Sequence, residues 1–270
     1  MATTLQFQGM HNARDLGGTP VSGGGSVKQG ALYRSDQLFS ATAGDIAAIR
    51  DLGLGAVIDL RSAEERAEKP DPEIDGVQNI GIPIVQDVRA GVTRDSKSKA
   101  VMMSLLARGG DGLEGFVLSY MSNLYKGFVA DEFSTAQYSR FVDEVIAFAD
   151  QGKAVWWHCT GGKDRAGFAT AIVLSALGAN WDDVVVDYLR TNECLAAVAD
   201  QLLASVGKVL PVGDNQAAAR RFFVADIEYL ETARRTAIDL YGSFDGFLEE
   251  GLGITAAKRS RMRELLVDAG

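Results

Sequence analysis

The sequence is poor in the side chains that build disulfide frameworks and metal centres, with two cysteines and two histidines among 270 residues. Two cysteines do not make a disulfide framework in a chain this long, so a reducing compartment is expected. No group of histidines and acidic residues has metal-ligand spacing along the chain. The sequence therefore predicts no metal and no other cofactor.

Neither a targeting segment nor a membrane segment is expected from the sequence. The first residues, MATTLQFQGMHNARDLGG, show no basic stretch followed by an apolar one, so no signal peptide is predicted. The longest apolar run, Ala166 to Ala179, is too short to span a membrane. We therefore expect a cytoplasmic protein without stable membrane insertion.

Positive charge is scarce as well, because 27 Lys and Arg face 36 Asp and Glu, for a net charge of -9. This balance argues against nucleic acid as a partner. It is compatible with an anionic substrate, since a local cluster of N–H groups and one or two cations can dominate the field inside a cleft. The sequence gives no sign of the oligomeric state.

Short apolar strands alternate with helical segments, which is typical of an α/β fold with a central, largely parallel sheet flanked by helices. A Gly-rich hairpin at 12–36 and an exposed, charged helix from Glu64 are expected in addition. The predicted strands are 31–34, 56–60, 154–158 and, at an edge because of Pro83, 80–85. The predicted helices are 41–52, 137–149, 166–177, 181–189 and 256–267.

We expect a single domain, 1–270, with insertions around 86–132 and 195–241. The first insertion is long and the least periodic part of the chain, a feature of segments that cover a site. The second resembles one or two long helices interrupted near Pro211. The two insertions could form a lid. The second carries both apolar and basic side chains, namely Leu202, Leu203, Phe222, Phe223, Arg220 and Arg221.

The most informative segment is AVWWHCTGGKDRAGFATAIVL, in which a hydrophobic strand leads into Cys159, five further residues and Arg165. A loop between a strand and a helix N-terminus directs several backbone N–H groups into one concavity, where the helix dipole favours an anion. Gly161 and Gly162 are expected to let the backbone curl with positive φ. Arg165 offers a planar fork for two phosphate oxygens, and the same field favours a reactive thiolate at Cys159.

Each part of this segment is weak evidence alone. A lone cysteine after a strand is usually a small core residue. The Gly-Gly-Lys-Asp run is not a nucleotide-binding P-loop, because the upstream glycine is missing and Asp164 stands where Ser or Thr would bind magnesium. Cysteine, five residues and arginine between a strand and a helix is a far more specific pattern. It predicts a phosphate cradle around a nucleophile.

HCTGGKDRAG resembles the signature loop of protein tyrosine phosphatases, and most of all that of the atypical bacterial tyrosine/lipid phosphatases, HC-x-A-G-K-D-R-T-G. Other segments look like recurring parts of that family in the same order, namely HNARDLGG, ALYRSDQL, VIDLRSAEER, DYLRTN and FLEEGLGIT. The resemblance covers nearly the whole chain.

The resemblance implies that Cys159 attacks phosphorus and forms a phosphocysteine, and that Asp164 is the general acid for the leaving group. Lys163 is similar to the lysine associated with hydrolysis of phosphoinositides as well as phosphotyrosine. The expected substrate is a phosphorylated protein, a phospholipid or a small phosphorylated molecule. The phosphoryl oxygens would be bound by the loop residues Thr160, Gly161, Gly162, Lys163, Asp164 and Arg165.

The chain departs from the family pattern at two positions, and two other functions stay open. Ala166 stands where a hydroxyl residue usually hydrogen-bonds the thiolate, which raises the alternative of a pseudophosphatase that binds phosphate and turns over poorly. Gly161 replaces the usual alanine and should only loosen the loop. A rhodanese-like sulfurtransferase also places a cysteine in an anion-binding loop, but that loop needs neither the arginine nor the internal acid.

Several residues outside the nucleophile and its arginine have two readings. Arg14, Asp15, Asp59 and Arg61 could rim the pocket or form an internal ion pair that ties the N-terminal segment to the sheet. His158 is expected to order the loop. Asp164 could instead stabilise the N-terminus of the following helix, in which case Asp87 or Asp131 would be the acid. The remaining expectations are structural: Tyr188 and Asn192 behind the loop, and Cys194 in the core.

Overall fold

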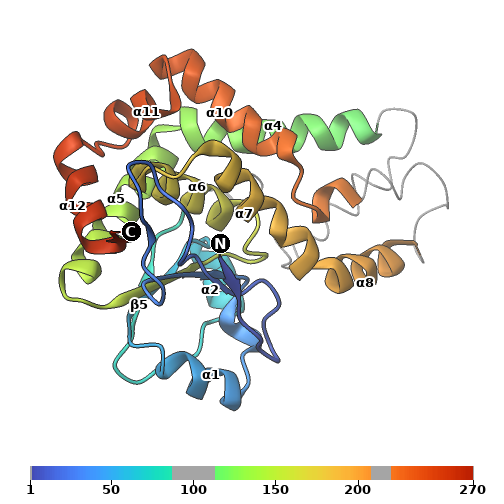
Figure 1. Cartoon of the computed structure of the whole chain (residues 1–270). Helices are drawn as coiled ribbons and strands as arrows, with labels where there is room; N and C mark the ends of the chain where they lie inside the picture. Colours follow the sequence, from blue (N-terminus) through green and yellow to red (C-terminus); the bar gives the residue numbers. More distant parts are fainter. Residues whose placement is uncertain (1, 87–112, 208–219, 270) are drawn as a thin grey trace.

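The computed structural model describes residues 2–86, 113–207 and 220–269, which form a helix-covered sheet (Figure 1). Six strands pair in the order β1-β2-β4-β7-β5-β6. The last four run parallel, and β1 and β2 are antiparallel to their neighbours. A separate pair joins β3 (Ser26–Val27) to β8 (Val267–Asp268). The strands of the main sheet are β1 (Thr3–Thr4), β2 (Arg14–Asp15), β4 (Leu32–Ser35), β7 (Ala154–His158), β5 (Leu54–Asp59) and β6 (Gln78–Gly81).

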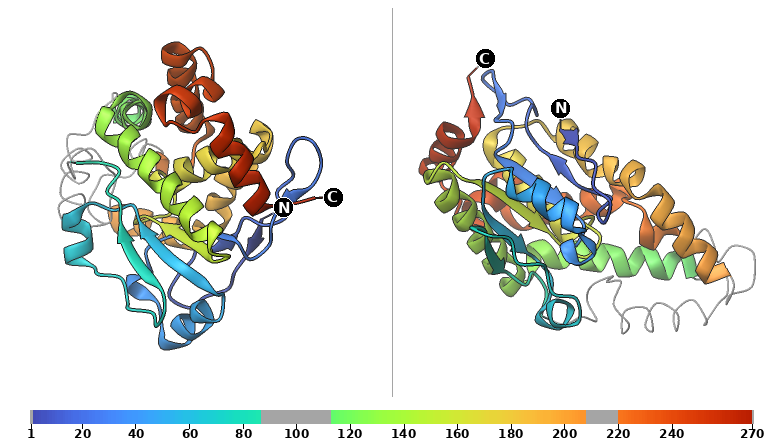
Figure 2. Two further views of the ribbon diagram at one scale, coloured as in Figure 1. Left: turned by 90° about the vertical axis from the view of Figure 1, so that its left-hand side faces the viewer. Right: turned by 90° about the horizontal axis from the view of Figure 1, so that it is seen from below.

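Helices cover both faces of this sheet (Figures 1 and 2). One face carries α1, whose N-cap Thr42 forms a capping box with Asp45. The other face carries most of the remaining helices, with α6 directly after β7. The helices are α1 (Ala43–Arg50), α2 (Ala63–Glu68), α4 (Leu113–Ala130), α5 (Glu132–Asp150), α6 (Arg165–Leu177), α7 (Trp181–Cys194), α8 (Ala196–Gly207), α10 (Ile227–Tyr241), α11 (Phe244–Gly246) and α12 (Ala256–Leu266), with a 3-10 turn at Leu38–Ser40 and a π turn at Phe247–Gly251.

The central strand β7 shows why the sheet is buried on both faces. Successive side chains of a strand point to opposite sides. Trp156 packs on the α1 side, stacked on Tyr33 with ring centroids 5.5 Å apart. Trp157 packs on the α6 side, where its indole N–H donates to Thr170 at 3.1 Å. A strand that is buried at every position and apolar up to its last residue therefore fits the centre of a parallel sheet.

The α/β class and the largely parallel sheet are confirmed, and most of the differences lie at element ends. The edge strand β6 occupies 78–81 and not 80–85, because Pro83 has no N–H to extend the ladder. Helix α5 begins before the predicted residue 137, because Asp131 caps it and accepts from the Ser134 N–H. Helix α7 continues beyond residue 189 to Cys194, and Val267 belongs to β8. The exposed, charged helix expected from Glu64 is present as α2, but its Glu65 is an exception and is only 4% exposed.

The two predicted insertions are only partly described. Residues 87–112 lie outside the description, and the rest of the first insertion forms α4 up to Ala130. In the second, Pro211 lies in 208–219, also outside it, and α8 and α10 lie on either side. Helix α10 packs along α4 (Figure 1). Among the helices of the described ranges, none combines the length and the apolar character needed to cross a membrane.

Candidate active site

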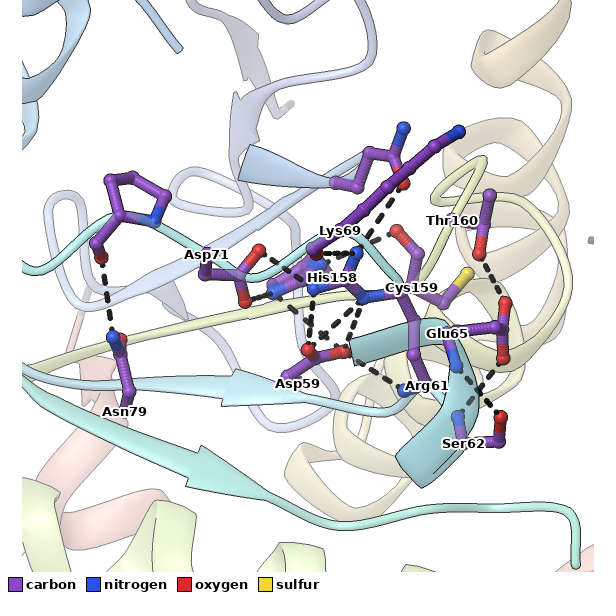
Figure 3. Close-up of polar contacts among 12 residues, drawn as sticks. Asp59, Arg61, Ser62, Glu65, Lys69, Asp71, Asn79, His158, Cys159 and Thr160 are labelled. Atoms are coloured by element: carbon purple, nitrogen blue, oxygen red, sulfur yellow. Dashed lines mark hydrogen bonds and ion pairs between the residues drawn. The ribbon is translucent and has the colours of Figure 1, made fainter. Parts of the chain in front are cut away.

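The register of the parallel strands gathers the site residues at one edge of the sheet. His158 at the end of β7 is level with Ser35 of β4 on one side and Asp59 of β5 on the other. The carboxyl ends of parallel strands are where α/β proteins build their sites. The loop 159–164 starts at this edge and leads directly into α6, so the predicted strand–loop–helix arrangement is present (Figure 3).

The two loop glycines differ in backbone conformation and in the space around them. Gly162 has a φ of 66°, and a Cβ there would lie 2.3 Å from the Ser35 carbonyl oxygen, so only glycine fits. Gly161 does not have a positive φ, contrary to the expectation, and the nearest atom to a Cβ there would be 4.0 Å away. The family's usual alanine would therefore fit at 161, and the departure there has little structural consequence.

Cys159 and Arg165 are both buried, at 2% and 3% exposure, at the base of the loop. The Arg165 guanidinium donates two hydrogen bonds to the Glu65 carboxylate, at 2.6 and 3.0 Å. It also donates to Thr160 Oγ1 at 3.3 Å, and the Thr160 hydroxyl donates to Glu65 at 2.5 Å. Figure 3 shows Glu65 and Thr160 beside the Cys159 sulfur. Glu65 thus fixes the plane of the arginine fork.

Electrostatics favour the charged forms of this pair. Burial alone would raise the pKa of Glu65, but the Arg165 charge and its hydrogen bonds lower that pKa to about 2. Burial alone would lower the pKa of Arg165, and the Glu65 carboxylate and the Cys159 sulfur more than offset this, so its pKa is raised. The positive charge of Arg165 is therefore permanent beside Cys159.

A second ion-pair group lies on the opposite side of the loop. The buried Asp187 of α7 accepts from Arg14 at 2.7 Å and from Arg34 at 2.6 Å. Arg34 also donates to the Gly162 carbonyl, and Asn12 donates to the Gly161 carbonyl at 3.0 Å. Burial and the nearby Arg14 charge lower the pKa of Arg34 to about 10, which leaves it charged at neutral pH.

Arg14 and Asp15 had two interpretations, a place at the rim of the pocket and an internal ion pair, and their contacts favour an internal role. Arg14 is fully buried and does not rim a pocket; it forms an internal ion pair, but with a helix and not with the sheet. Asp15 accepts from the N–H groups of Gly17 and Gly30 and so stabilises the turns around β2. Both residues serve the scaffold behind the loop.

Asp59, Arg61, Asp71 and His158 form a third buried group (Figure 3). The Arg61 guanidinium donates to Asp59 at 2.7 Å and to Asp71 at 2.8 Å. The His158 Nε2 lies 2.8 Å from Asp71, and Nδ1 lies 3.3 Å from the Cys159 carbonyl oxygen. This arrangement fits the expectation that His158 orders the loop.

Charge within this third group is balanced. Burial opposes protonation of His158, but Asp71 and Asp59 raise its pKa above the usual value. Burial alone would raise the pKa of Asp71, but His158 and Arg61 lower it to about 2. Asp59, Asp71 and His158 place ligand atoms within 4.8 Å of one another, a cluster of metal-ligand type that spacing along the sequence does not reveal. Arg61 supplies the cation between these two carboxylates.

Asp164 stands at the N-cap position of α6, yet its side chain makes no capping hydrogen bond. It accepts instead from the Tyr125 hydroxyl of α4 at 2.9 Å, and it lies 3.5 Å from Lys163 Nζ. Tyr125 is also hydrogen-bonded to the Tyr188 hydroxyl of α7 at 2.7 Å. The capping alternative for Asp164 therefore has no hydrogen bond to support it.

Lys163 connects the loop to the segment before α10. Its ammonium donates to the carbonyls of Phe222 at 2.6 Å and Val224 at 3.2 Å. The side-chain amide of Asn192 donates to the Ala225 carbonyl through Nδ2 and accepts from the Ala225 N–H through Oδ1. Asn192 thus holds this segment and not the back of the loop, where Tyr188 does lie as expected.

The other predicted site residues are placed as follows. Ala166 is fully buried in the first turn of α6. Cys194 is only partly buried, so the core position expected for it is wrong. Asp131 caps α5 through Ser134. Asp87 lies outside the described residues.

Sequence reasoning missed five buried side chains that contact the loop or its supports: Arg34, Glu65, Asp71, Tyr125 and Asp187. Only Glu65 left a local signal. Ser62 and Glu65 form a capping box at the start of α2, which predicts that the Glu65 side chain turns back toward the helix start. The others reach the loop from distant parts of the chain. Arg34 and Asp187 do stand in segments that resemble the family's, but the sequence does not show which residues they contact.

Comparison with known proteins gives consistent results over nearly the full length. A sequence model of the tyrosine phosphatase family matches residues 5–268. A Cupriavidus necator protein named as a candidate tyrosine-protein phosphatase is 31% identical over 254 residues, covering 94% of this chain and 86% of that protein. The triple specificity protein phosphatase PtpB of Mycobacterium tuberculosis is 29% identical over 282 aligned positions, covering 97% of this chain and 98% of that protein. The crystal structure of P. aeruginosa TpbA aligns with 77% of this chain and 89% of its own, at 15% identity and a TM-score of 0.30.

Proposed function

The chain belongs to the tyrosine phosphatase family and is a phosphatase, and from this premise we propose that it cleaves phosphate monoesters through a phosphocysteine on Cys159. The observation that carries the proposal is the buried Cys159 beside an Arg165 fork oriented by Glu65. We further propose that residues 1–270 act as one domain, in keeping with the family match to residues 5–268.

The reaction has two steps. In the first, the Cys159 thiolate attacks phosphorus, the bond from phosphorus to the leaving oxygen breaks, and Asp164 gives its proton to that oxygen. In the second, water attacks the phosphocysteine, Asp164 takes a proton from the water, and the sulfur–phosphorus bond breaks. Inorganic phosphate leaves, and the thiolate and the protonated Asp164 are restored.

Arg165 and the loop amides bind the phosphoryl oxygens in both steps. The loop 159–164 ends at the positive end of α6, and it supplies N–H groups from Thr160 to Arg165. Glu65 holds the Arg165 fork in one plane, so little orientation remains to be imposed when substrate binds. This preorganisation is the reason that a bound oxyanion is stabilised as charge develops.

The tyrosine chain orients the acid. A tyrosine hydroxyl can donate only one hydrogen bond, and Tyr125 donates its own to Asp164. The 2.7 Å hydrogen bond between Tyr125 and Tyr188 must therefore be donated by Tyr188. Burial raises the pKa of both tyrosines well above the ordinary value, which keeps them neutral donors. With Oδ1 of Asp164 occupied as an acceptor, the transferable proton sits on Oδ2. Tyr125 is therefore a positioning residue for the acid.

The proposed substrate class is phosphotyrosine, with phosphoserine, phosphothreonine and phosphoinositides as further candidates. The name of the M. tuberculosis relative, a triple specificity phosphatase, supports a broad range. Lys163 offers a cation beside the loop that suits a second phosphate group, once its contacts with Phe222 and Val224 are exchanged for substrate. The segment before α10 would then act as part of the predicted lid.

Hydrolysis of p-nitrophenyl phosphate tests the chemistry. We expect turnover without added metal, inhibition by vanadate and complete loss in Cys159→Ser. Phosphate binding without turnover in the unaltered protein would favour the pseudophosphatase alternative, which Ala166 raises. Sulfur transfer from thiosulfate would instead favour the rhodanese-like alternative.

Leaving-group dependence tests the acid and its support. Asp164→Asn should lower the rate on phenyl phosphate far more than on p-nitrophenyl phosphate, because only the poorer leaving group needs the proton. Tyr125→Phe should show the same selectivity with a smaller loss, about tenfold in kcat on phenyl phosphate. The matched control is Tyr229→Phe, whose ring packs on Tyr125 while its hydroxyl donates to the Arg221 carbonyl. Equal losses on both substrates in Asp164→Asn would remove it from the acid role.

A further inference from the structure

A second pocket lies at the opposite end of α6 from the catalytic loop. Its volume is about 570 Å³, within the usual range for small-molecule sites. The loop leads into the first residue of α6, whereas Ala176 and Gly178 at the other end line this pocket. A 13-residue helix is about 20 Å long, so a molecule bound here does not touch Cys159. The other lining residues come from α10, α11, α12, the start of α7 and the segment at Ser22.

Arginine dominates the lining of this pocket. Arg234, Arg259 and Arg263 line it together with a single acidic residue, Asp245, in a protein whose net charge is -9. Arg259 donates to the Asp245 carboxylate at 2.6 Å and thereby balances it. Arg234 and Arg263 add positive charge to the lining, and Glu231, 3.7 Å from Arg234, offsets part of it.

Neither of these two arginines hydrogen-bonds a carboxylate within the described part of the chain. Arg263 donates to the backbone carbonyls of Ser22, at 2.7 Å, and Leu177. Those carbonyls fix the side chain but carry only partial charges. For Arg234 the nearest ion-pair partner is Glu231, at 3.7 Å, which is too long for a hydrogen bond. The pair can therefore accept an anion without breaking a buried salt bridge.

An aromatic wall lies beside the arginines. The Arg234 guanidinium sits 4.7 Å from the centroid of the Trp181 ring, which holds it in place. The Trp181 indole N–H donates to Glu231 at 2.5 Å, and the Phe244 ring is 5.0 Å from that of Trp181. Both rings are partly exposed within the pocket lining. The wall is thus preformed, which reduces the ordering cost of binding.

We propose that this pocket binds a small organic anion, with a carboxylate or phosphate group on a flat apolar body. The acid group is held by Arg234 and Arg263, since a guanidinium fork matches the oxygens of either group. The flat body contacts Trp181 and Phe244. The pocket is thereby a ligand site separate from the phosphatase centre.

Tryptophan indole signals in a ¹H–¹⁵N spectrum give a direct test. Trp156 and Trp157 are fully buried next to the catalytic loop, whereas Trp181 lines the second pocket, and its signal is identified by its loss in Trp181→Phe. The probes are 2-naphthoate, naphthalene-2-phosphonate and the neutral 2-naphthamide. We expect both anions to shift the Trp181 signal. Titration of that shift should give each anion a dissociation constant at least about tenfold lower than that of the amide. The tighter of the two anions identifies the acid group.

Variants complete the test. Arg234→Gln and Arg263→Gln should each weaken the binding of 2-naphthoate about tenfold or more. Arg235→Gln is the matched control, because Arg235 is an exposed neighbour on α10 that pairs with Glu228 outside the pocket. If Arg263→Gln disturbs folding, seen as lost signal dispersion, Arg234→Gln decides alone. Equal binding of the amide, no shift of the Trp181 signal, or unchanged binding in Arg234→Gln would overturn the proposal and leave the phosphatase assignment untouched.

Discussion

The loop 159–164 is held from two sides by buried ion pairs of different design. On the Glu65 side (Glu65, Thr160 and Arg165), one carboxylate binds one arginine whose charge also acts on the Cys159 sulfur. On the Asp187 side (Arg14, Arg34 and Asp187), one carboxylate is shared by two arginines, and one of them binds the Gly162 carbonyl of the loop.

The two groups are expected to have different roles, the first in the proposed reaction and the second in the stability of the fold. The Glu65 side orients a group that touches the phosphoryl oxygens in the proposed reaction, so a substrate anion can make up for part of its loss. The Asp187 side is sealed between α7, β2 and β4, and no substrate reaches its charges. Damage to the first should therefore appear mainly in catalysis, and damage to the second mainly in stability.

The largest effect is expected from Asp187→Asn. The substitution leaves two fully buried arginine charges with no full counter-charge, which costs about 3–5 kcal/mol of the free energy of unfolding. Urea unfolding measures it. Asp182→Asn, an exposed position on the first turn of the same helix, is the control and should change stability by no more than about 0.5 kcal/mol. Equal stability of the two variants would refute the scaffold role.

Glu65→Gln should mainly impair catalysis. The Arg165 fork loses its charged bidentate partner, and misorientation of a catalytic group by about 1 Å costs about 100-fold in kcat/KM. The loss of stability should be smaller than in Asp187→Asn, and vanadate should recover more of it, because a bound oxyanion supplies a partner for Arg165. Kinetics on p-nitrophenyl phosphate and unfolding with and without vanadate measure both. A variant that is unstable but fully active when folded would reverse the comparison.

The loop glycines sharpen the contrast on a smaller scale. Gly162→Ala places a Cβ against the Ser35 carbonyl at positive φ and should cost about 1–3 kcal/mol of stability, with a loss of activity. Gly161→Ala meets no atom closer than 4.0 Å and should be neutral within about 0.5 kcal/mol. Thermal melting and kcat measure the pair. Similar losses in both variants would mean that the loop backbone differs from the one described.

The smallest effect concerns pH and His158, which lies next to Cys159 and pairs with Asp71. Its pKa is raised in the folded protein, so its contribution to stability is present below the unfolded pKa, about 6.5, and is lost as the pH rises through the folded pKa. Each unit of the shift is worth about 1.4 kcal/mol. Stability should therefore decline above about pH 6.5, and His158→Gln should flatten that decline. Glu65 and Asp71, each with a pKa of about 2, titrate far below this range.

The sequence predicts the centre of the molecule well. Strand β7, the loop and α6 are contiguous, so the strand–loop–helix order that brings Cys159 and Arg165 together can be predicted from local sequence. Hydrophobic periodicity and caps such as Thr42 place most of the other elements. Element ends were less accurate where a cap decides them, as at Asp131.

The supports of the loop could not be predicted in the same way. Asp187 meets Arg14 across 173 positions of sequence, and Tyr125 meets Asp164 across 39. From a single sequence, an arginine that is buried in an ion pair cannot be distinguished from an arginine on the surface. The sequence accordingly leaves two interpretations open for Arg14, and it does not single out Glu65 as the buried member of an otherwise exposed helix.

The central claim is that Cys159 carries the phosphoryl group during turnover. The direct measurement is mass spectrometry of peptides from Asp164→Asn, denatured rapidly during turnover of p-nitrophenyl phosphate. This variant should accumulate the intermediate, because the second step also needs Asp164. We predict that the peptide containing Cys159 gains the mass of one phosphoryl group and that Cys159→Ser shows no gain. Steady turnover with no phosphoryl group on that peptide, or with one on another residue, would contradict the account.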